Sequence, residues 1–583
     1  MRGRELITPS YSIYKKLEQR AVKKYNNLMK KNDEFELEIT GIGKDGEGIG
    51  HFDGMTFFVP GALPGDTIKA AVTKLKKTYG YARVLSILSP SPDRVESPCP
   101  VSARCGGCSL MNLSYKAQLR MKEDTVEDDL VRIGGFDRDF IKKIKEPIIG
   151  MTDPMRYRNK AQIPVGMMPD GRIVTGFYAR HSHRIIEPDP SVGCLIGAPE
   201  NQEITHAIKS WMYENKLRAY DETTQKGLIR HILIRHGVHT GQVMVCLVIN
   251  GKSIPAIDSL VERLTVACPD ITSICININK NTGNVILGER TECIWGEPVI
   301  TDKVGEITFD ISAKSFFQVN PVQMEKLYSK ALEYADLKGS ENVYDLYSGI
   351  GTISLFLAKK AGHVTGVEVV PDAVKDAVRN AKLNGFSNTN FYTGKTEDVL
   401  PKLVAQGRPA DVIVLDPPRK GAEKSVLETI LSVSPSRIVY VSCDPATLSR
   451  DLRLLCEEGT YELKKYTPVD QFPESVHVET CVLLGRKIVN DKNVEYMHVD
   501  YEPKDNEYLK GIKGSATYAE IKAWIKEQYN VSVSSLYIAQ CKDACGFEKR
   551  ENYNTGAEGH RVPNCPEEKK KLILEAFKHF KMI

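Results

Sequence analysis

The spacing of apolar and polar residues changes along the chain and divides it into regions of different expected structure. Short alternating runs separated by glycine-rich turns fill residues 33–90 and predict a small β-barrel. These runs cover residues 35–39, 56–59, 67–72 and 81–88. A proline-rich stretch at residues 89–92 then opens a mixed α+β region, residues 91–310. Its strand-like runs cover residues 229–234, 243–249 and 274–278.

The second half of the chain adds helical patterns. Residues 311–486 alternate strand and helix in the βαβ manner, which predicts a mostly parallel sheet. Residues 487–510 are polar and charged without a clear period, so we expect a linker, and residues 511–583 are expected to form a separate helical unit. Its signals are a capping box from Thr517 to Glu520, an apolar face of Ile521, Trp524 and Ile525, and a second face of Ile573, Ala576, Phe577 and Phe580.

Composition is that of an ordinary globular protein. The chain has 583 residues, of which 42% are hydrophobic and 26% charged, enough for several domains with their own cores. No stretch approaches the roughly 20 apolar residues of a membrane span, and the first residues lack an apolar run of signal-peptide type. We therefore expect a cytoplasmic protein with no membrane partner. In that reducing compartment the 14 cysteines are expected to be thiols, metal ligands or nucleophiles rather than disulfides.

The net charge of +4 conceals two basic segments. Residues 1–32, a basic arm, carry nine Lys or Arg against two Glu, hence +7, and fit a solvated segment and an RNA-contacting segment equally well. Residues 69–83 of the predicted barrel contain no acidic residue. They include Lys74, Lys76 and Lys77, with Tyr79 and Tyr81 beside them. Lysines beside aromatic rings are typical of a surface that binds phosphates and stacks on bases. We therefore favour RNA binding here over a face that is only solvated.

A glycine turn follows the first strand of the βαβ region. The segment from Asp345 to Gly351 places Gly349 and Gly351 between a strand and an apolar helix, where glycine lets the backbone approach a ligand. The next strand ends in Glu368, seventeen residues after Gly351, where a carboxylate can accept both hydroxyls of a ribose. The pattern D-x-x-x-G-x-G differs from the pyrophosphate-binding G-x-G-x-x-G, which favours S-adenosylmethionine over a dinucleotide.

Three further chemical groups stand at strand ends. Asp416 follows an apolar strand and precedes two prolines, Cys443 ends the next strand, and Glu479 leads into the last one. Ligands bind beyond the carboxyl ends of strands in such sheets, so Asp416 is expected near a cofactor and Cys443 is a candidate nucleophile. Glu479 is a candidate general base. The structural alternatives are a turn-capping carboxylate, a buried packing thiol and a structural carboxylate, respectively.

Three closely spaced cysteines follow the predicted barrel. Cys99, Cys105 and Cys108 are spaced C-x5-C-x2-C, and Cys194 lies far downstream. In a reducing compartment this spacing is typical of a thiolate site for an iron–sulfur cluster or zinc, and spacing alone does not separate the two. Near the end of the chain Cys541, Cys545, His560 and Cys565 could bind zinc, although ordinary thiols in a small helical domain explain them as well.

Taken together, the motifs resemble those of the S-adenosylmethionine-dependent RNA (uracil-5-)-methyltransferases, most closely the branch that modifies 23S ribosomal RNA. The resemblance covers residues 33–486 and has one departure, Ser348, where relatives often have cysteine. Its motifs are Cys99-x5-Cys105-Gly-Gly-Cys108, Phe316-Phe-Gln318-Val-Asn320, Asp345-Leu-Tyr-Ser-Gly349, Asp416-Pro-Pro-Arg-Lys-Gly, Ser442-Cys443-Asp444-Pro445 and His477-Val-Glu479.

The resemblance implies a multidomain α/β fold. Its parts would be an N-terminal TRAM barrel of OB-like form, a central α+β domain holding a 4Fe–4S cluster and a Rossmann-like methyltransferase domain, to which this chain adds the small helical C-terminal extension. By motif, the cluster ligands would be Cys99, Cys105, Cys108 and Cys194. The cofactor would be bound by Gln318, Tyr347, Gly349, Glu368 and Asp416.

The implied reaction is methylation of uridine at C5. Cys443 would attack C6 of the base, which makes C5 nucleophilic, and Glu479 would remove the C5 proton after methyl transfer. We expect RNA, most of all 23S rRNA, as the partner and a monomeric protein. The alternatives are a tRNA uracil-5 methyltransferase, an RNA cytosine-5 methyltransferase, and a non-catalytic rRNA-binding assembly factor.

Overall fold

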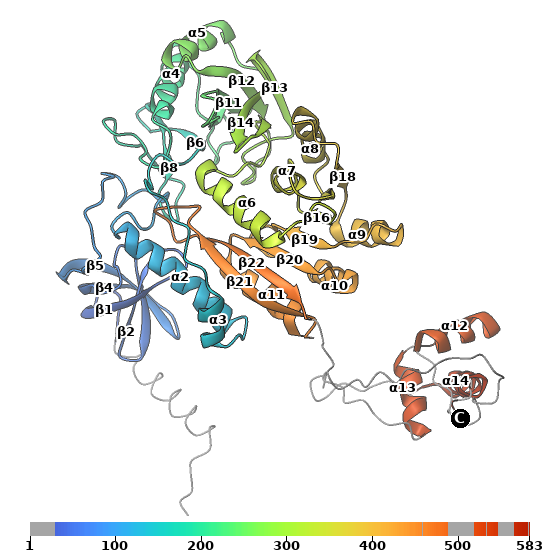
Figure 1. The fold of residues 1–583 in the computed structure, drawn as a ribbon. Helices are drawn as coiled ribbons and strands as arrows, with labels where there is room; N and C mark the ends of the chain where they lie inside the picture. The colour runs from blue at the N-terminus through green and yellow to red at the C-terminus, as the bar shows by residue number, and fades with distance from the viewer. Residues whose placement is uncertain are drawn as a thin grey trace, which may run out of the picture. The chain divides into compact units, whose positions relative to one another are not determined.

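Five strands near the start of the described chain close into a small barrel (Figure 1). They are β1 (Glu34–Ile42), β2 (Gly48–Phe52), β3 (Met55–Val59), β4 (Thr67–Leu75) and β5 (Tyr79–Ser89). Alternate residues of β1, namely Phe35, Leu37 and Ile39, are buried inside it. The predicted barrel is confirmed. The sequence pattern missed β2, because Gly48 and Gly50 made that strand look like part of a turn.

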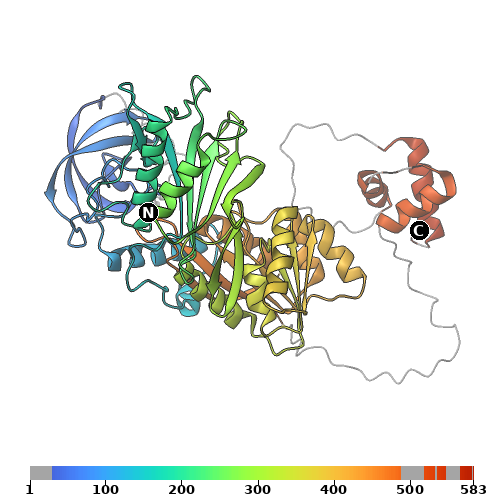
Figure 2. The same cartoon turned by 90° about the horizontal axis from the view of Figure 1, so that it is seen from above.

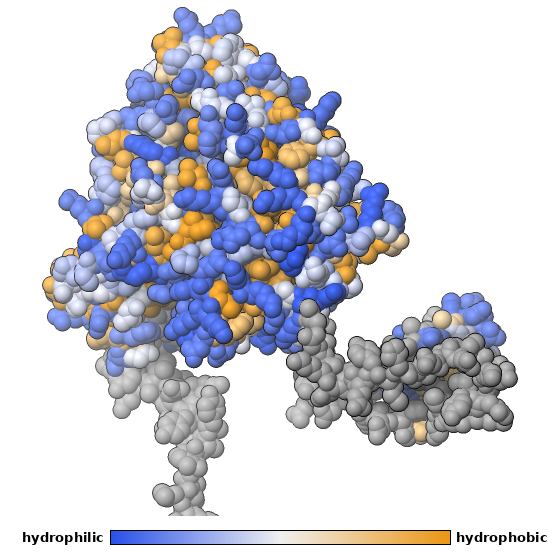
Figure 3. Space-filling view, viewed as in Figure 1, coloured by the Kyte–Doolittle hydropathy of each residue, from blue (hydrophilic) through white to orange (hydrophobic). Residues whose placement is uncertain are grey.

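The computed structural model describes residues 29–457, 459–487, 518–531, 533, 535–545, 565–580 and 582. By its contacts the chain forms two units, Met1–Val489 and Asn490–Ile583. Most of the basic arm, Thr517 of the capping box and His560 lie outside the described residues. Among the described residues, no helix combines the length and the apolar character that crossing a membrane requires. On the face shown in Figure 3, the apolar side chains of the larger unit are scattered among hydrophilic ones.

The central region is a six-stranded sheet in the order β13-β12-β11-β10-β6-β7. Its strands are β6 (Lys160–Met167), β7 (Ile173–Thr175), β10 (Ile229–His236), β11 (Val243–Ile249), β12 (Ile271–Ile278) and β13 (Arg290–Gly296). Helices α4 (Glu200–Glu214) and α5 (Ile257–Ala267) pack their apolar residues, among them Trp211 and Leu260, against one face. Two short strands, β8 (Phe177–Tyr178) and β9 (Ile185–Ile186), form a separate pair. The hairpin of β14 (Val299–Val304) and β15 (Ile307–Ser312) spans position 310, where the sequence pattern places a boundary.

The region after this hairpin is a seven-stranded sheet in the order β18-β17-β16-β19-β20-β22-β21. Its strands are β16 (Asn342–Leu346), β17 (His363–Glu368), β18 (Thr389–Thr393), β19 (Val412–Leu415), β20 (Arg437–Ser442), β21 (Tyr461–Val469) and β22 (Glu479–Arg486). The first five run parallel, whereas β22 and β21 are antiparallel to their neighbours. The strand order reverses between β16 and β19, which is where ligands bind in such sheets.

Helices cover both faces of this sheet, as Figure 2 shows for the yellow and orange part of the chain. One face packs on α6 (Pro321–Ala335), α7 (Thr352–Ala358) and α8 (Pro371–Leu383). The other packs on α9 (Thr396–Ala405), α10 (Lys424–Val433) and α11 (Pro445–Glu457), and on α2 (Tyr115–Arg132) and α3 (Arg138–Ile144), which follow the barrel in sequence. The predicted Rossmann-like sheet is therefore confirmed, and α2 and α3 extend its helical layer.

The second unit is a small helical cluster. It contains α12 (Tyr518–Tyr529), α13 (Ser535–Ala544) and α14 (Glu567–His579). The predicted faces are buried: Ile521, Ile525, Ile573, Ala576 and Phe577 are fully buried, and Trp524 and Phe580 pack against them. Helix α13, which the periodicity did not predict, adds Ile538 and Cys541 to the same core.

Candidate active site and cysteine centre

One edge of the seven-stranded sheet carries the two predicted catalytic groups, Cys443 and Glu479, together with Asp416, a predicted cofactor-binding residue. Asp416 follows β19, and Cys443 follows β20. Strand β22 runs the opposite way, so its first residue, Glu479, lies at the same edge, where Thr480 pairs with Ser442. The turn after Cys443 is fixed because the Thr447 N–H donates to Asp444 Oδ1 at the start of α11, over 3.0 Å. The structure thus brings together three residues that are far apart in sequence.

Burial sets the protonation of these groups. It raises the pKa of Asp416 to about 7 and the pKa of Glu479 well above its usual range, and the charge of Asp416 raises that of Glu479 further. The pKa of the Cys443 thiol rises to about 12 because of burial and then the charges of Glu479 and Asp416, while Arg419 opposes the rise. One Glu479 oxygen, Oε2, is buried without a hydrogen-bond partner among the described residues. A carboxyl of raised pKa beside a thiol can accept and release a proton near neutral pH.

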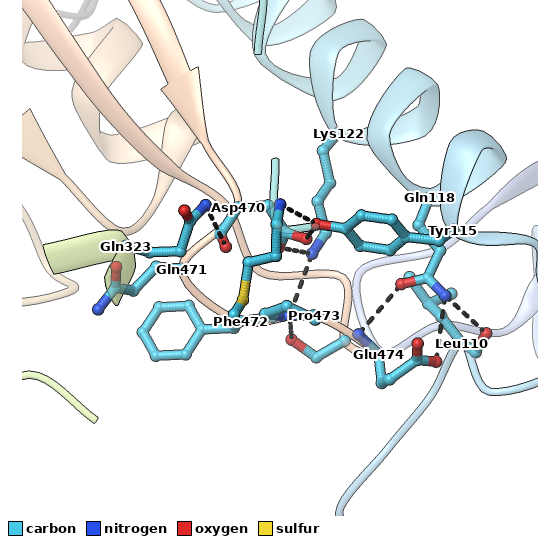
Figure 4. A network of polar contacts seen from close by, with 12 residues as sticks. Leu110, Tyr115, Gln118, Lys122, Gln323, Asp470, Gln471, Phe472, Pro473 and Glu474 are labelled. Atoms are coloured by element: carbon cyan, nitrogen blue, oxygen red, sulfur yellow. Dashed lines mark hydrogen bonds and ion pairs between the residues drawn. The ribbon is translucent and has the colours of Figure 1, made fainter. Parts of the chain in front are cut away.

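The loop of residues 470–478 positions Glu479. This loop joins β21 to β22, and Val469 pairs with Glu479 at its base. At its start Lys122 Nζ of α2 lies 2.5 Å from Asp470 Oδ1, with both side chains fully buried (Figure 4). Tyr115 donates its hydroxyl to the other oxygen of Asp470 over 2.8 Å, and Lys122 also donates to the Phe472 carbonyl at 3.0 Å. The loop is therefore anchored to α2 by a satisfied buried ion pair.

The same loop is anchored to the chain that follows Cys108. The N–H groups of Ser109 and Leu110 both donate to the Glu474 carbonyl, over 2.9 and 3.1 Å. Gln118 of α2 joins the two segments, because it donates to the Leu110 carbonyl and Glu474 Oε2 and accepts from the Glu474 N–H (Figure 4). Glu474 is buried with a positive φ of 65°, and burial raises its pKa to about 7. Sequence reasoning missed this network, since lysine and glutamine on a helix usually face solvent.

The glycine turn lies at the adjacent strand ends. The Gly349 N–H donates to Glu368 Oε2 at 3.1 Å, so the predicted ribose-binding carboxylate is held against the turn. Tyr347 has a positive φ of 69°, a strained backbone for a residue with a side chain. Ser348 Oγ is a buried polar atom without a partner among the described residues. Gln318 is buried, and its backbone carbonyl accepts from Asn159 over 3.0 Å. Orphaned polar atoms beside a glycine turn suit a polar ligand.

The four predicted cluster cysteines converge. Cys99, Cys105, Cys108 and Cys194 all line one cavity of about 290 Å³. Burial raises the pKa of Cys105, Cys108 and Cys194, and in each case the charge of neighbouring cysteines raises it further. Thiolates that repel one another in a buried site are stabilised by a shared metal, so the donor set fits an iron–sulfur cluster or zinc.

The remaining cysteines differ in their surroundings. Cys246, Cys268, Cys275 and Cys481 are buried, and all fourteen are free thiols. In the second unit burial raises the pKa of Cys541 to about 11, and Cys565 and Cys545 add to the rise. These three cysteines are thus close together, while the fourth predicted zinc ligand, His560, lies outside the described residues.

Comparisons with known proteins match both main parts of this architecture. Residues 297–487 match the family model for tRNA (Uracil-5-)-methyltransferase, and residues 29–85 match the TRAM domain. An uncharacterized RNA methyltransferase of Halalkalibacterium halodurans is 50% identical over 457 residues, which cover 78% of this chain and 98% of that protein. One of Clostridium acetobutylicum is 47% identical, over 79% of this chain and 98% of the relative.

A solved structure has the same overall fold. It is that of the Pyrococcus abyssi tRNA (uracil-54, C5)-methyltransferase in complex with S-adenosyl-L-homocysteine. It superposes with a TM-score of 0.61 at 26% identity, and the match covers 77% of this chain and 99% of that chain. The likeness therefore includes the barrel-bearing unit as a whole as well as the methyltransferase sheet. From the sheet-edge site, the barrel and these relatives together, the chain belongs to the TRAM-containing tRNA (uracil-5-)-methyltransferase-like family of RNA methyltransferases.

Proposed function

We propose that the protein transfers a methyl group from S-adenosylmethionine to C5 of a uridine in 23S rRNA and forms 5-methyluridine. The observation that carries this proposal is the meeting of Asp416, Cys443 and Glu479 at one sheet edge, next to the glycine turn. The family match to uracil-5 methyltransferases supports it. The non-catalytic alternative is disfavoured because a purely binding protein has no use for a thiol and two buried carboxyls in one place.

In the proposed mechanism Cys443 acts first. Its thiolate attacks C6 of the uracil, the C5=C6 bond opens, and the negative charge moves to C5 and the O4 carbonyl. The thiol has a raised pKa, so its proton must leave as the uracil binds, and the Asp416 carboxylate can accept it, which leaves Glu479 ionised for the last step. When bound, S-adenosylmethionine supplies an electrophilic methyl group. The target nucleotide must leave its stack to reach Cys443.

Glu479 acts last. After C5 has taken the methyl group, the carboxylate of Glu479 removes the C5 proton, the C5=C6 bond re-forms, and the Cys443 sulfur leaves as thiolate. The high pKa of Glu479 makes it an effective proton acceptor. Gln318, Tyr347, Gly349, Glu368 and Asp416 are proposed to hold the cofactor. The oxygens of Glu368 each accept one backbone N–H here and retain lone pairs for ribose hydroxyls.

The cysteine centre is proposed to hold a 4Fe–4S cluster on Cys99, Cys105, Cys108 and Cys194. The cluster has no step in the methyl transfer, so its role would be to fix the surrounding loops. Protein purified without oxygen should contain iron and acid-labile sulfide. Zinc without sulfide would assign the same four thiols to the other metal.

A second candidate substrate is tRNA, because the Pyrococcus abyssi enzyme of similar fold is a tRNA methyltransferase. Unmodified 23S rRNA and tRNA transcripts should therefore be incubated with labelled S-adenosylmethionine in parallel and digested to nucleosides. Label in 5-methyluridine from 23S rRNA supports the proposal. Label found only in tRNA would make tRNA the substrate. Label found in 5-methylcytidine would make cytosine the methylated base. We also infer that the protein is cytoplasmic and monomeric. Light scattering of the purified protein tests whether it is a monomer.

A further inference from the structure

A second cavity lies where the barrel, the cysteine loop and the catalytic region meet. Its volume is about 360 Å³. Its charged residues and histidines are Lys44 and Asp45 of the β1–β2 turn, Arg158, Arg180 and His181 of the central region, and Arg419 and His477 of the catalytic region. We call it the arginine cavity. It is separate from the cavity lined by the four cysteines, although Gly107 and Arg158 border both.

Within the described residues the arginines of this cavity are not neutralised by ion pairs, although one acidic residue, Asp45, also lines it. Among the residues that the structure describes, no carboxylate forms an ion pair with Arg158, Arg180 or Arg419. Lys44, whose side chain is 86% exposed, lies 3.7 Å from Asp444, and Asp45 is the one acidic side chain among the lining residues. Guanidinium groups that line one cavity without ion-pair partners suit a phosphate, which they can bind through paired hydrogen bonds, while the carboxylate of Asp45 offsets part of the positive charge.

The walls of the cavity pack closely against one another at two glycines. Gly46 of the barrel turn has a φ of 84°, and a Cβ there would lie 2.5 Å from the Ser109 Cβ. A Cβ on Gly106 would lie 2.8 Å from the Tyr178 carbonyl oxygen. Both distances are shorter than real contacts allow, so only glycine permits these approaches. The barrel turn thus packs on the cysteine loop, and the cysteine loop packs on the central region.

The cavity adjoins the proposed nucleophile. Lys44 pairs with Asp444, the residue next to Cys443, and the charge of Arg419 acts on the Cys443 thiol. An enzyme that extracts a nucleotide from its stack must hold the backbone on either side of it. We propose that the arginine cavity binds one phosphodiester of the RNA strand beside the target nucleotide, with Arg180 and Lys44 as positioning residues. This inference rests on the proposed function and describes how the site at Cys443 holds the RNA strand.

Salt-dependent binding tests the proposal. The probe is a short fluorescein-labelled single-stranded RNA containing one uridine, and its affinity is measured over a series of salt concentrations. Arg180→Gln should weaken binding and make the slope of log affinity against log salt shallower by roughly 0.7, the value for one phosphate contact on single strands. Arg180→Lys should retain most of the slope. Arg263→Gln is the matched control, because Arg263 is paired with Glu214 on another part of the surface and does not line the cavity.

A neutral linkage identifies the ligand as phosphate. Replacing the phosphodiester next to the uridine by a methylphosphonate should weaken binding to the wild-type protein and have little further effect on Arg180→Gln. Fully additive losses, or an Arg180→Gln variant with an unchanged slope, would overturn the proposal and leave methylation itself untouched. Unchanged RNA binding would also be the outcome if the cavity served an acidic protein partner. Because binding needs no turnover, a protein that binds RNA in this way but methylates none would refute the proposed function alone. Lys44→Gln, a change at an exposed side chain, repeats the test if Arg180→Gln fails to fold.

Discussion

The two centres of the larger unit are built by different kinds of structure. Asp416, Cys443 and Glu479 stand at the ends of strands that are hydrogen-bonded to one another, so the ladder itself fixes their spacing. The four cysteines of the other centre stand outside helices and strands, three of them on one loop at residues 99–108 and the fourth, Cys194, on a second loop much further along the chain. A strand-end site is held by the backbone, whereas a loop site depends on the ligand that its side chains share.

The centres are nevertheless connected. The chain directly after Cys108 donates two backbone hydrogen bonds to Glu474, within the loop that leads into Glu479. Gln118 of helix α2 forms hydrogen bonds with both segments, and Lys122 forms an ion pair with Asp470 at the start of the loop. A change at the cysteine centre can therefore reach the proposed base without moving the strands.

The largest effect is expected at the strand-end thiol. Cys443→Ala removes the proposed nucleophile and should reduce methylation on the order of 10⁴-fold or more, while binding of S-adenosylmethionine stays within its normal range. Both are measured on the same preparation, by label transfer and by calorimetry. Cys293→Ala, a change at an exposed thiol, is the control and should keep full activity. Turnover retained by Cys443→Ala would remove the nucleophile assignment.

The base at the same edge should give a different defect. Glu479→Gln leaves attack and methyl transfer possible but blocks removal of the C5 proton, so methylation should slow by about 10²–10⁴-fold. A covalent RNA–protein adduct should accumulate, visible as a slower band in denaturing gels. Cys443→Ala combined with Glu479→Gln should abolish the adduct. Release of methylated RNA at the normal rate by Glu479→Gln would place the base elsewhere.

The connection between the centres should depend on the buried ion pair. Lys122→Met leaves the Asp470 carboxylate buried without its cation and should lower the free energy of unfolding by about 3–5 kcal/mol. Adding Asp470→Asn removes the buried charge but keeps an oxygen for Tyr115, and most of the loss should be recovered. Denaturant titration measures both, with Lys116→Met on the exposed side of α2 as the control.

The same pair gives an activity readout. If the loop positions Glu479, the Lys122→Met protein should accumulate the same adduct as Glu479→Gln. The assay is run without denaturant, so that the variant remains folded. A stability loss without adduct would mean that the pair is structural and does not position the base.

The parts of this molecule that follow a period could be predicted from sequence. Alternation predicted four of the five barrel strands, all except β2, and the βαβ pattern placed Asp416 and Cys443 at one edge, because parallel strands end together. Lys122 could not be placed this way, because its partner Asp470 lies 348 residues further along the chain and an isolated lysine on a helix reads as solvent-facing. Arg180 is similar: it sits in a loop, and only the fold shows that it shares a cavity with Arg419.

The smallest effect concerns Glu474, which lies between the two centres. Burial raises its pKa from the ordinary 4.5 to about 7, so the folded chain keeps this proton to a higher pH than the unfolded chain does. Its contribution to stability is therefore complete below about pH 4.5 and is lost as the pH rises towards 7, by up to about 1.4 kcal/mol per pH unit. Glu474→Gln, which is neutral at every pH and can still accept from Gln118, should make stability fall less steeply across this window. Unfolding curves at a series of pH values measure the difference, and equal slopes for the two proteins would show that Glu474 is already ionised in the folded state. In that case Glu474 would be a buried negative charge, and the hydrogen bonds from Ser109 and Leu110 to its carbonyl would have to hold the loop despite the cost of burying that charge. The segment after Cys108 would then do more to position Glu479 than the Lys122–Asp470 ion pair does.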